Sequence, residues 1–125
     1  MKIYTGYFAK QKQYVANGLI PVSIARFNKY FSGASLKLLA PSAEMIHEPE
    51  STYIPKYENI LSKLNKEGII KELERLTNGK DCILLCYEKP SDFCHRQLVS
   101  KWLGSSCLGE YETAIKEIKQ PTLFQ

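Results

Sequence analysis

The chain has 125 residues, a net charge of +4 and 44% hydrophobic residues. This length suits one domain that buries a core without disulfide or metal staples. No apolar run approaches the roughly 18 residues of a membrane span, and the N-terminus lacks the apolar region of a signal peptide. We therefore expect a cytoplasmic protein that contacts no membrane and whose four cysteines are reduced thiols.

The basic residues are unevenly distributed along the chain. Residues 1–43 contain six lysines and arginines and no acid, whereas the remainder carries 11 basic and 13 acidic residues. Aromatic residues are interleaved with these cations, a combination that suits phosphate backbones and stacked bases. The alternative is that the aromatic residues form core and the lysines a solvated rim.

The first half of the chain alternates between strand and loop patterns. Residues 3–8 and 19–25 are rich in β-branched and aromatic residues and predict two strands. Residues 10–18 are polar and typical of a loop, as are residues 27–33. Ser42 has the character of an N-cap and predicts a short helix after it.

The second half has helical periodicity and one strong strand. Apolar residues recur at helical spacing after Pro55 and again after Asn65, which we expect to cap its helix, with Asn78 near its end. Residues 81–87 form the best strand, and residues 93–103 the helix that follows it. Residues 110–118 fit a last helix or an extended segment. This pattern predicts a small single α/β domain over residues 1–119, with a mostly parallel sheet flanked by helices, and a flexible tail over residues 120–125.

The most informative stretch, residues 86–96, has the sequence C-Y-E-K-P-S-D-F-C-H-R. Two thiols, a carboxylate, an imidazole and a guanidinium meet there at one strand-to-helix junction. Open α/β sheets bind ligands at such junctions, outside the carboxyl ends of the strands. A functional site is therefore expected in this stretch.

Two functional interpretations fit these residues. In the first, the free N–H groups at the helix N-terminus and the Arg96 guanidinium bind an anion. In the second, the helix N-terminus lowers the pKa of a cysteine, which favours Cys94 over Cys86 as nucleophile. His95 would then transfer a proton or orient a partner, and Glu88 would be a general base or an orienting carboxylate.

Two further interpretations compete with these. Cys86, Glu88, Cys94 and His95 are all zinc or iron ligand types, but the C-x7-C spacing is longer than the usual knuckle. Neighbouring helical positions such as Cys94 and His95 also point about 100° apart. We therefore expect no metal and no cofactor. In the structural interpretation, Cys86 is a buried small hydrophobe on the strand face that it shares with Cys82.

The same residues resemble a known family. Its L-L-C-x-E-x-P…C-H-R-x-L signature, that of the domain of unknown function 488 family, is similar to residues 84–90 followed by residues 93–98 here. Residues 4–7 and 23–27 resemble its first two strands, so the resemblance covers about residues 3–103. It implies a compact α/β domain with a polar site, but no substrate. The residues that the resemblance carries over are Arg26, Cys86, Glu88, Cys94, His95 and Arg96.

The last residues resemble a second pattern. Gln120-Pro121-Thr122-Leu123-Phe124 is similar to the Q-x-x-L-F peptide by which bacterial DNA-processing proteins bind the replication sliding clamp. Leu123 and Phe124 would enter an apolar pocket, and Gln120 would make orienting hydrogen bonds. Alternatively, Leu123 and Phe124 dock on the domain's own core.

Together these features predict an enzyme or phosphate-binding module acting on nucleotides or nucleic acids. Arg26, Arg96 and Thr5 would bind the anionic group of a phosphate-bearing small molecule or a nucleic acid, and the clamp would be a second partner. The alternative is a non-catalytic nucleic-acid- or protein-binding adaptor in which the Cys-His-Arg cluster is structural.

Overall fold

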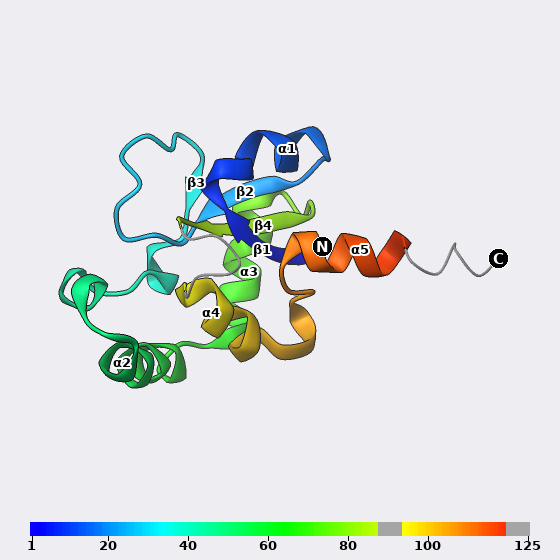
Figure 1. The fold of residues 1–125 in the computed structure, drawn as a ribbon. Helices are drawn as coiled ribbons and strands as arrows, with labels where there is room; N and C mark the ends of the chain where they lie inside the picture. Colours follow the sequence, from blue (N-terminus) through cyan, green and yellow to red (C-terminus); the bar gives the residue numbers. More distant parts are fainter. Residues whose placement is uncertain (88–93, 120–125) are drawn as a thin grey trace.

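The structure, a computed structural model, describes residues 1–87 and 94–119. Its centre is a sheet of four strands in the order β1-β4-β2-β3, and every neighbouring pair is parallel (Figure 1). The strands are β1 (Ile3–Tyr7), β2 (Ile20–Ser23), β3 (Ala34–Ser35) and β4 (Cys82–Cys86). The predicted α/β class with a parallel sheet is confirmed.

Helices pack on both faces of this sheet (Figure 1). One face is covered by α2 (Glu50–Ser62), α3 (Lys66–Thr77) and α4 (His95–Leu103), and the other by α1 (Gln11–Ala16) and α5 (Tyr111–Lys119). Short 3-10 helices lie between these elements: η1 (Phe8–Lys10), η2 (Lys37–Leu39), η3 (Ala43–His47) and η4 (Gly104–Ser106). Within the described residues, no helix combines the length and apolarity that crossing a bilayer requires.

The ends of α3 follow from its sequence. The Asn65 side chain accepts a hydrogen bond from the Gly68 backbone N–H at 2.8 Å, which satisfies one of the unpaired donors of the first turn. Asn78 ends the helix in the left-handed region at φ 58°, a conformation that asparagine tolerates better than most residues. Both predicted boundaries of this helix are confirmed.

The predicted loop over residues 10–18 is wrong. Residues 11–16 form α1, and Tyr14 within it is fully buried. Tyr14 lies against Gly6 of β1, where a Cβ would come within 2.6 Å of its hydroxyl oxygen, and it donates a hydrogen bond to Glu112 of α5 at 2.9 Å. These tertiary contacts stabilise a helix whose polar sequence shows little periodicity. The C-terminal segment, for which the sequence left helix and strand open, is the helix α5.

Strand register positions the candidate site. Tyr7 pairs with Cys86 and Thr5 with Leu84, so Thr5, Tyr7 and Cys86 lie on one face near the carboxyl ends of their strands. Ser23 at the end of β2 pairs with Leu85 on the other side of β4. The segments that leave β1, β2 and β4 therefore emerge together, at the end of the sheet where the carboxyl ends of these strands lie.

Candidate functional site

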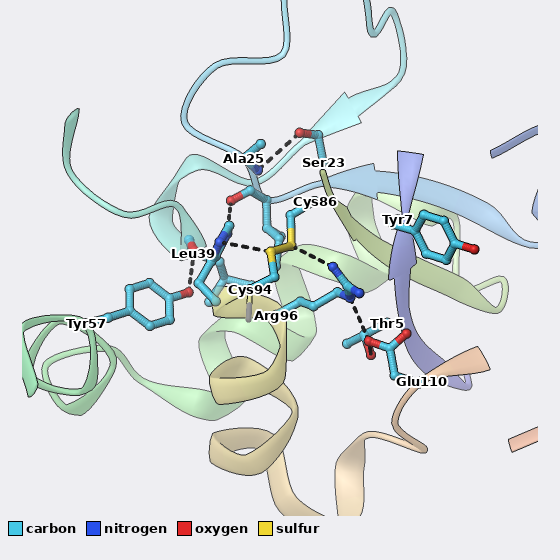
Figure 2. The surroundings of a disulfide bond; sticks show 12 residues. Thr5, Tyr7, Ser23, Ala25, Leu39, Tyr57, Cys86, Cys94, Arg96 and Glu110 are labelled. Atoms are coloured by element: carbon cyan, nitrogen blue, oxygen red, sulfur yellow. Dashed lines mark hydrogen bonds and ion pairs between the residues drawn. A yellow bond between two sulfur atoms is a disulfide. The ribbon is translucent and has the colours of Figure 1, made fainter. Parts of the chain in front are cut away.

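A disulfide joins the end of β4 to the start of α4 (Figure 2). Its partners are Cys86, the last residue of the strand, and Cys94, the N-cap of the helix, and both are buried. The expectation of four reduced thiols is therefore wrong for these two, while Cys82 and Cys107 are free. No local pattern predicts this pairing, because it depends on how the chain returns from strand to helix.

The Arg96 side chain lies against the Cys86 sulfur of this disulfide and is fully buried. Its Nη1 donates a hydrogen bond to Cys86 Sγ at 3.3 Å, and its Nε donates to Glu110 Oε1 at 2.6 Å (Figure 2). Its guanidinium carbon lies 5.9 Å from the centre of the Tyr7 ring. A positive charge is thus held against the Cys86 sulfur, with the Glu110 carboxylate as its counter-ion.

Glu110 is the site residue that sequence reasoning missed. Its carboxylate also accepts a hydrogen bond from the Thr5 hydroxyl at 3.2 Å, and the neighbouring Gly109 carbonyl accepts one from the Thr5 backbone N–H. Glu110 Oε2 is buried and has no hydrogen-bond partner among the described residues. No local signal could identify Glu110, since its partners lie 14 and 105 positions away. Thr5, an expected anion ligand, is buried and bonded to Glu110; its role toward an anion stays a prediction.

His95 is held as a neutral imidazole. Its Nε2 lies 2.7 Å from the Ile24 carbonyl oxygen, and its Nδ1 lies 3.7 Å from Cys94 Sγ. A carbonyl only accepts, so we assign the ring proton to Nε2, which leaves the Nδ1 lone pair facing the sulfur. Burial lowers the pKa of His95 to about 4; the nearby Arg96 charge also lowers it, and the bond to Ile24 opposes both. This state suits an orienting role.

A pocket of about 240 Å³ opens at this edge of the sheet, and Arg26, Cys86, Cys94 and His95 all line it. Arg26 reaches it because β2 is parallel and adjacent to β4, and its Nε donates to the Pro41 carbonyl at 2.8 Å. Arg96 does not line the pocket. Of the two expected anion-binding arginines, Arg26 lines the cavity, and Arg96 contacts Cys86, which lines it.

Three side chains that line this pocket, those of Cys86, Cys94 and His95, could also hold a metal ion. Each offers one sulfur or nitrogen ligand atom, and all three atoms lie within 4.8 Å of one another. The expectation against a metal assumed that Cys94 is helical. Its backbone is instead extended, at φ −146° and ψ 150°, so the argument from diverging helical neighbours does not hold.

The N-terminal aromatic residues divide between core and surface. Tyr4 and Tyr14 are buried, whereas Tyr30 is 93% and Phe27 63% exposed. Phe27 lines the pocket, and its carbonyl accepts a hydrogen bond from the Tyr87 hydroxyl at 2.7 Å. The interpretation as core therefore holds for Tyr4 and Tyr14, and the role of the exposed rings toward a nucleic acid stays a prediction.

Several predicted site residues lie outside the described residues. These are Glu88, in the segment between β4 and α4, and three residues of the tail, Gln120, Leu123 and Phe124. Their expected roles stay predictions.

A comparison with protein families places most of the chain in a family. Residues 15–106 match the family profile DUF488-N3a, described as the active DUF488-N3 subclade. No match was found among curated proteins or among solved structures. The matched residues include β2, β4 and α4, and with them Arg26, Cys86, Cys94, His95 and Arg96.

Proposed function

The chain belongs to the active DUF488-N3 subclade of the DUF488 family, and on this premise we propose that it is an enzyme whose nucleophile is the reduced thiolate of Cys86. The observation that carries this proposal is the contact of 3.3 Å between Arg96 Nη1 and Cys86 Sγ. A neighbouring guanidinium stabilises a thiolate, and the thiolate is the reactive form of cysteine. The pocket gives a substrate access to this sulfur.

The geometry favours Cys86 over Cys94, the cysteine that the sequence favoured. Cys94 is the N-cap of α4, but its side chain makes no capping hydrogen bond with the backbone of the first turn. Its sulfur lies 3.7 Å from His95 Nδ1, on an imidazole that burial keeps neutral at physiological pH. The contact between Arg96 and Cys86 therefore decides the assignment, and we propose Cys94 as the second thiol of the pair.

For the substrate we propose a phosphate-bearing nucleotide or nucleic acid. Arg26 lines the same pocket as Cys86, and its bond to the Pro41 carbonyl holds the guanidinium at the pocket wall. Guanidinium groups bind phosphate through paired hydrogen bonds. The exposed Phe27 beside it offers a ring on which a base could stack. We also propose that the protein acts in the cytoplasm.

The chemical step starts from the reduced pair. A thiol reductant supplies two electrons and two protons to the disulfide, which yields the Cys86 and Cys94 thiols. Once Cys86 has lost its proton, its sulfur donates an electron pair to an electrophilic atom of the substrate. A sulfur–substrate bond forms, and the leaving group departs with the electron pair of the bond that breaks.

The rate of alkylation tests this proposal against the non-catalytic adaptor. The protein is reduced, freed of metal with a chelator, and treated with iodoacetamide at neutral pH, and the labelled peptides are quantified by mass spectrometry. We expect Cys86 to react faster than a free peptide thiol, and Arg96→Met to slow it. Cys107, which is partly exposed and has no arginine partner in the described contacts, is the internal control. Labelling of Cys86 at or below the peptide rate would favour the adaptor.

A further inference from the structure

We propose that Cys86, Cys94 and His95, in the reduced protein, form a three-ligand site for Zn²⁺. This inference concerns metal binding alone and does not require that Cys86 be a nucleophile. Two thiolates and one imidazole are a ligand set that zinc prefers, and in catalytic zinc sites three protein ligands leave a fourth position for water or substrate.

The separation between the Cys94 sulfur and the His95 nitrogen agrees with tetrahedral coordination, and the two sulfurs, which are bonded to each other in the disulfide, move apart once it is reduced. With zinc–sulfur and zinc–nitrogen bonds of about 2.3 and 2.05 Å, a tetrahedral angle separates a sulfur from a nitrogen ligand by about 3.6 Å. Cys94 Sγ and His95 Nδ1 lie 3.7 Å apart. The extended backbone of Cys94 makes this separation possible, because its side chain does not diverge from that of His95 as two helical neighbours would. The Cys86 sulfur completes the group, with all ligand atoms within 4.8 Å.

The surroundings of the three ligands also suit a metal. Metal-bound histidines usually donate their other ring N–H to a carbonyl or carboxylate, which fixes the ring and its tautomer. The Ile24 carbonyl, 2.7 Å from His95 Nε2, is placed for that bond. Arg96 donates to the Cys86 sulfur and is itself balanced by Glu110. Two thiolates would neutralise the charge of Zn²⁺, so the cluster would add no net charge to the core.

The pocket provides the fourth position. Cys86, Cys94 and His95 all line the cavity of about 240 Å³, so an ion that they hold would face a space large enough for water or a small anion. The disulfide uses the same two sulfurs. The oxidised and the metal-bound protein therefore exclude each other, and binding to the reduced protein releases the two thiol protons.

Cobalt titration tests the site, because Co²⁺ reports thiolate coordination by its absorption. The disulfide is reduced with a water-soluble phosphine, which takes up one water oxygen as phosphine oxide and leaves two thiols. Anaerobic addition of Co²⁺ should then produce a sulfur-to-cobalt charge-transfer band and intense visible bands of a tetrahedral ion, saturating at one equivalent. Zn²⁺ should abolish both. The protein that keeps its disulfide should show neither.

Three variants locate the ligands. Cys94→Ser and His95→Gln should each weaken or abolish the bands, while Cys107→Ser, which removes a thiol outside the cluster, should leave them unchanged. Far-ultraviolet circular dichroism shows whether each variant is folded. If a variant unfolds, a second measurement uses the unaltered, reduced protein. Bound Zn²⁺ should slow the alkylation of Cys86 and Cys94 in it. Absence of the bands and of this protection would overturn the proposal, as would bands that persist in folded Cys94→Ser. The alkylation assay above is metal-free, so either proposal can fail without the other.

Discussion

Arg96 Nε donates a hydrogen bond to Glu110 Oε1 at 2.6 Å, and this ion pair joins α4 to the segment that precedes α5. The Arg96 side chain is fully buried, and that of Glu110 is 18% exposed. Water can do little to replace either partner. Loss of either partner would therefore leave a buried charge, and the pair fixes the guanidinium against the Cys86 sulfur.

Breaking this pair from either side should destabilise the protein. Arg96→Met leaves the Glu110 carboxylate without its cation, and Glu110→Gln leaves a buried guanidinium without its anion. Loss of one partner of a buried pair costs about 3 kcal/mol of unfolding free energy. In the double variant neither charge remains, so the combined loss should be smaller than the sum of the two single losses. Urea denaturation measures all three.

The exposed pair of Glu72 and Arg75 supplies the matched control, since it joins the same residue types within one helix at the surface. Arg75→Met and Glu72→Gln should change the urea midpoint little, because solvent screens this pair. Strict additivity for Arg96 and Glu110 would contradict the coupling that the structure indicates.

Arg26 should govern anion binding at the pocket. Arg26→Ala removes the guanidinium that lines the cavity, and we expect it to weaken the binding of pyrophosphate, measured by calorimetry, about tenfold or more. Lys29→Ala removes a charge of the same sign near the exposed Tyr30 ring and outside the residues that line the pocket, so its effect should be small. Equal losses in the two variants would point to a diffuse charge effect.

Stability should fall at alkaline pH. Burial raises the pKa of the Cys82 thiol from 9.0 to about 12; Cys107 and Asp81 add to this shift, and the N-terminal amine opposes it. The unfolded chain loses this proton first, so the stabilisation is complete below about pH 9 and is lost as the pH rises toward about 12. The slope is about 1.4 kcal/mol per pH unit for each such proton. The buried Tyr14 and Tyr57, whose pKa values burial also raises, act in the same direction.

Urea denaturation across this pH range measures the effect, and Cys82→Ala isolates one group. The variant should be less stable at neutral pH, because it leaves a small cavity in the core. Its unfolding free energy should nevertheless decline less steeply with pH than that of the unaltered protein. A slope that does not change would show that Cys82 contributes nothing to the alkaline loss.

The tail should bind a sliding clamp. Leu123 and Phe124 would fill an apolar pocket of the clamp while Gln120 makes polar contacts. Replacing Leu123 and Phe124 by alanine should abolish binding to the purified clamp in a surface-plasmon experiment and leave the melting temperature nearly unchanged. A marked drop in melting temperature would show instead that the two residues belong to the core. Binding that survives the replacement would mean that other residues make the contact.

The sequence by itself determined those features that depend on neighbours along the chain. The apolar run in residues 82–85 predicts β4, and helical periodicity between Asn65 and Asn78 predicts α3 with both of its ends. It also predicts a candidate site at the junction between β4 and α4, because ligand-binding residue types cluster there within one short stretch. Local patterns carry this information, since strand and helix periods and capping bonds involve residues only a few positions apart.

Only the tertiary structure decided which of these groups meet. It pairs Cys86 with Cys94. It places Arg26 at the pocket wall, whereas Arg96 does not line the pocket. It also brings Glu110 to Thr5, which lies 105 positions away along the chain. Such partners depend on the order and register of the parallel strands, which bring distant segments to one edge of the sheet. The residue types and spacings in a sequence do not reveal whether two distant side chains are in contact. Only the fold therefore shows that Arg26 lines the pocket while Arg96 contacts the Cys86 sulfur and Glu110.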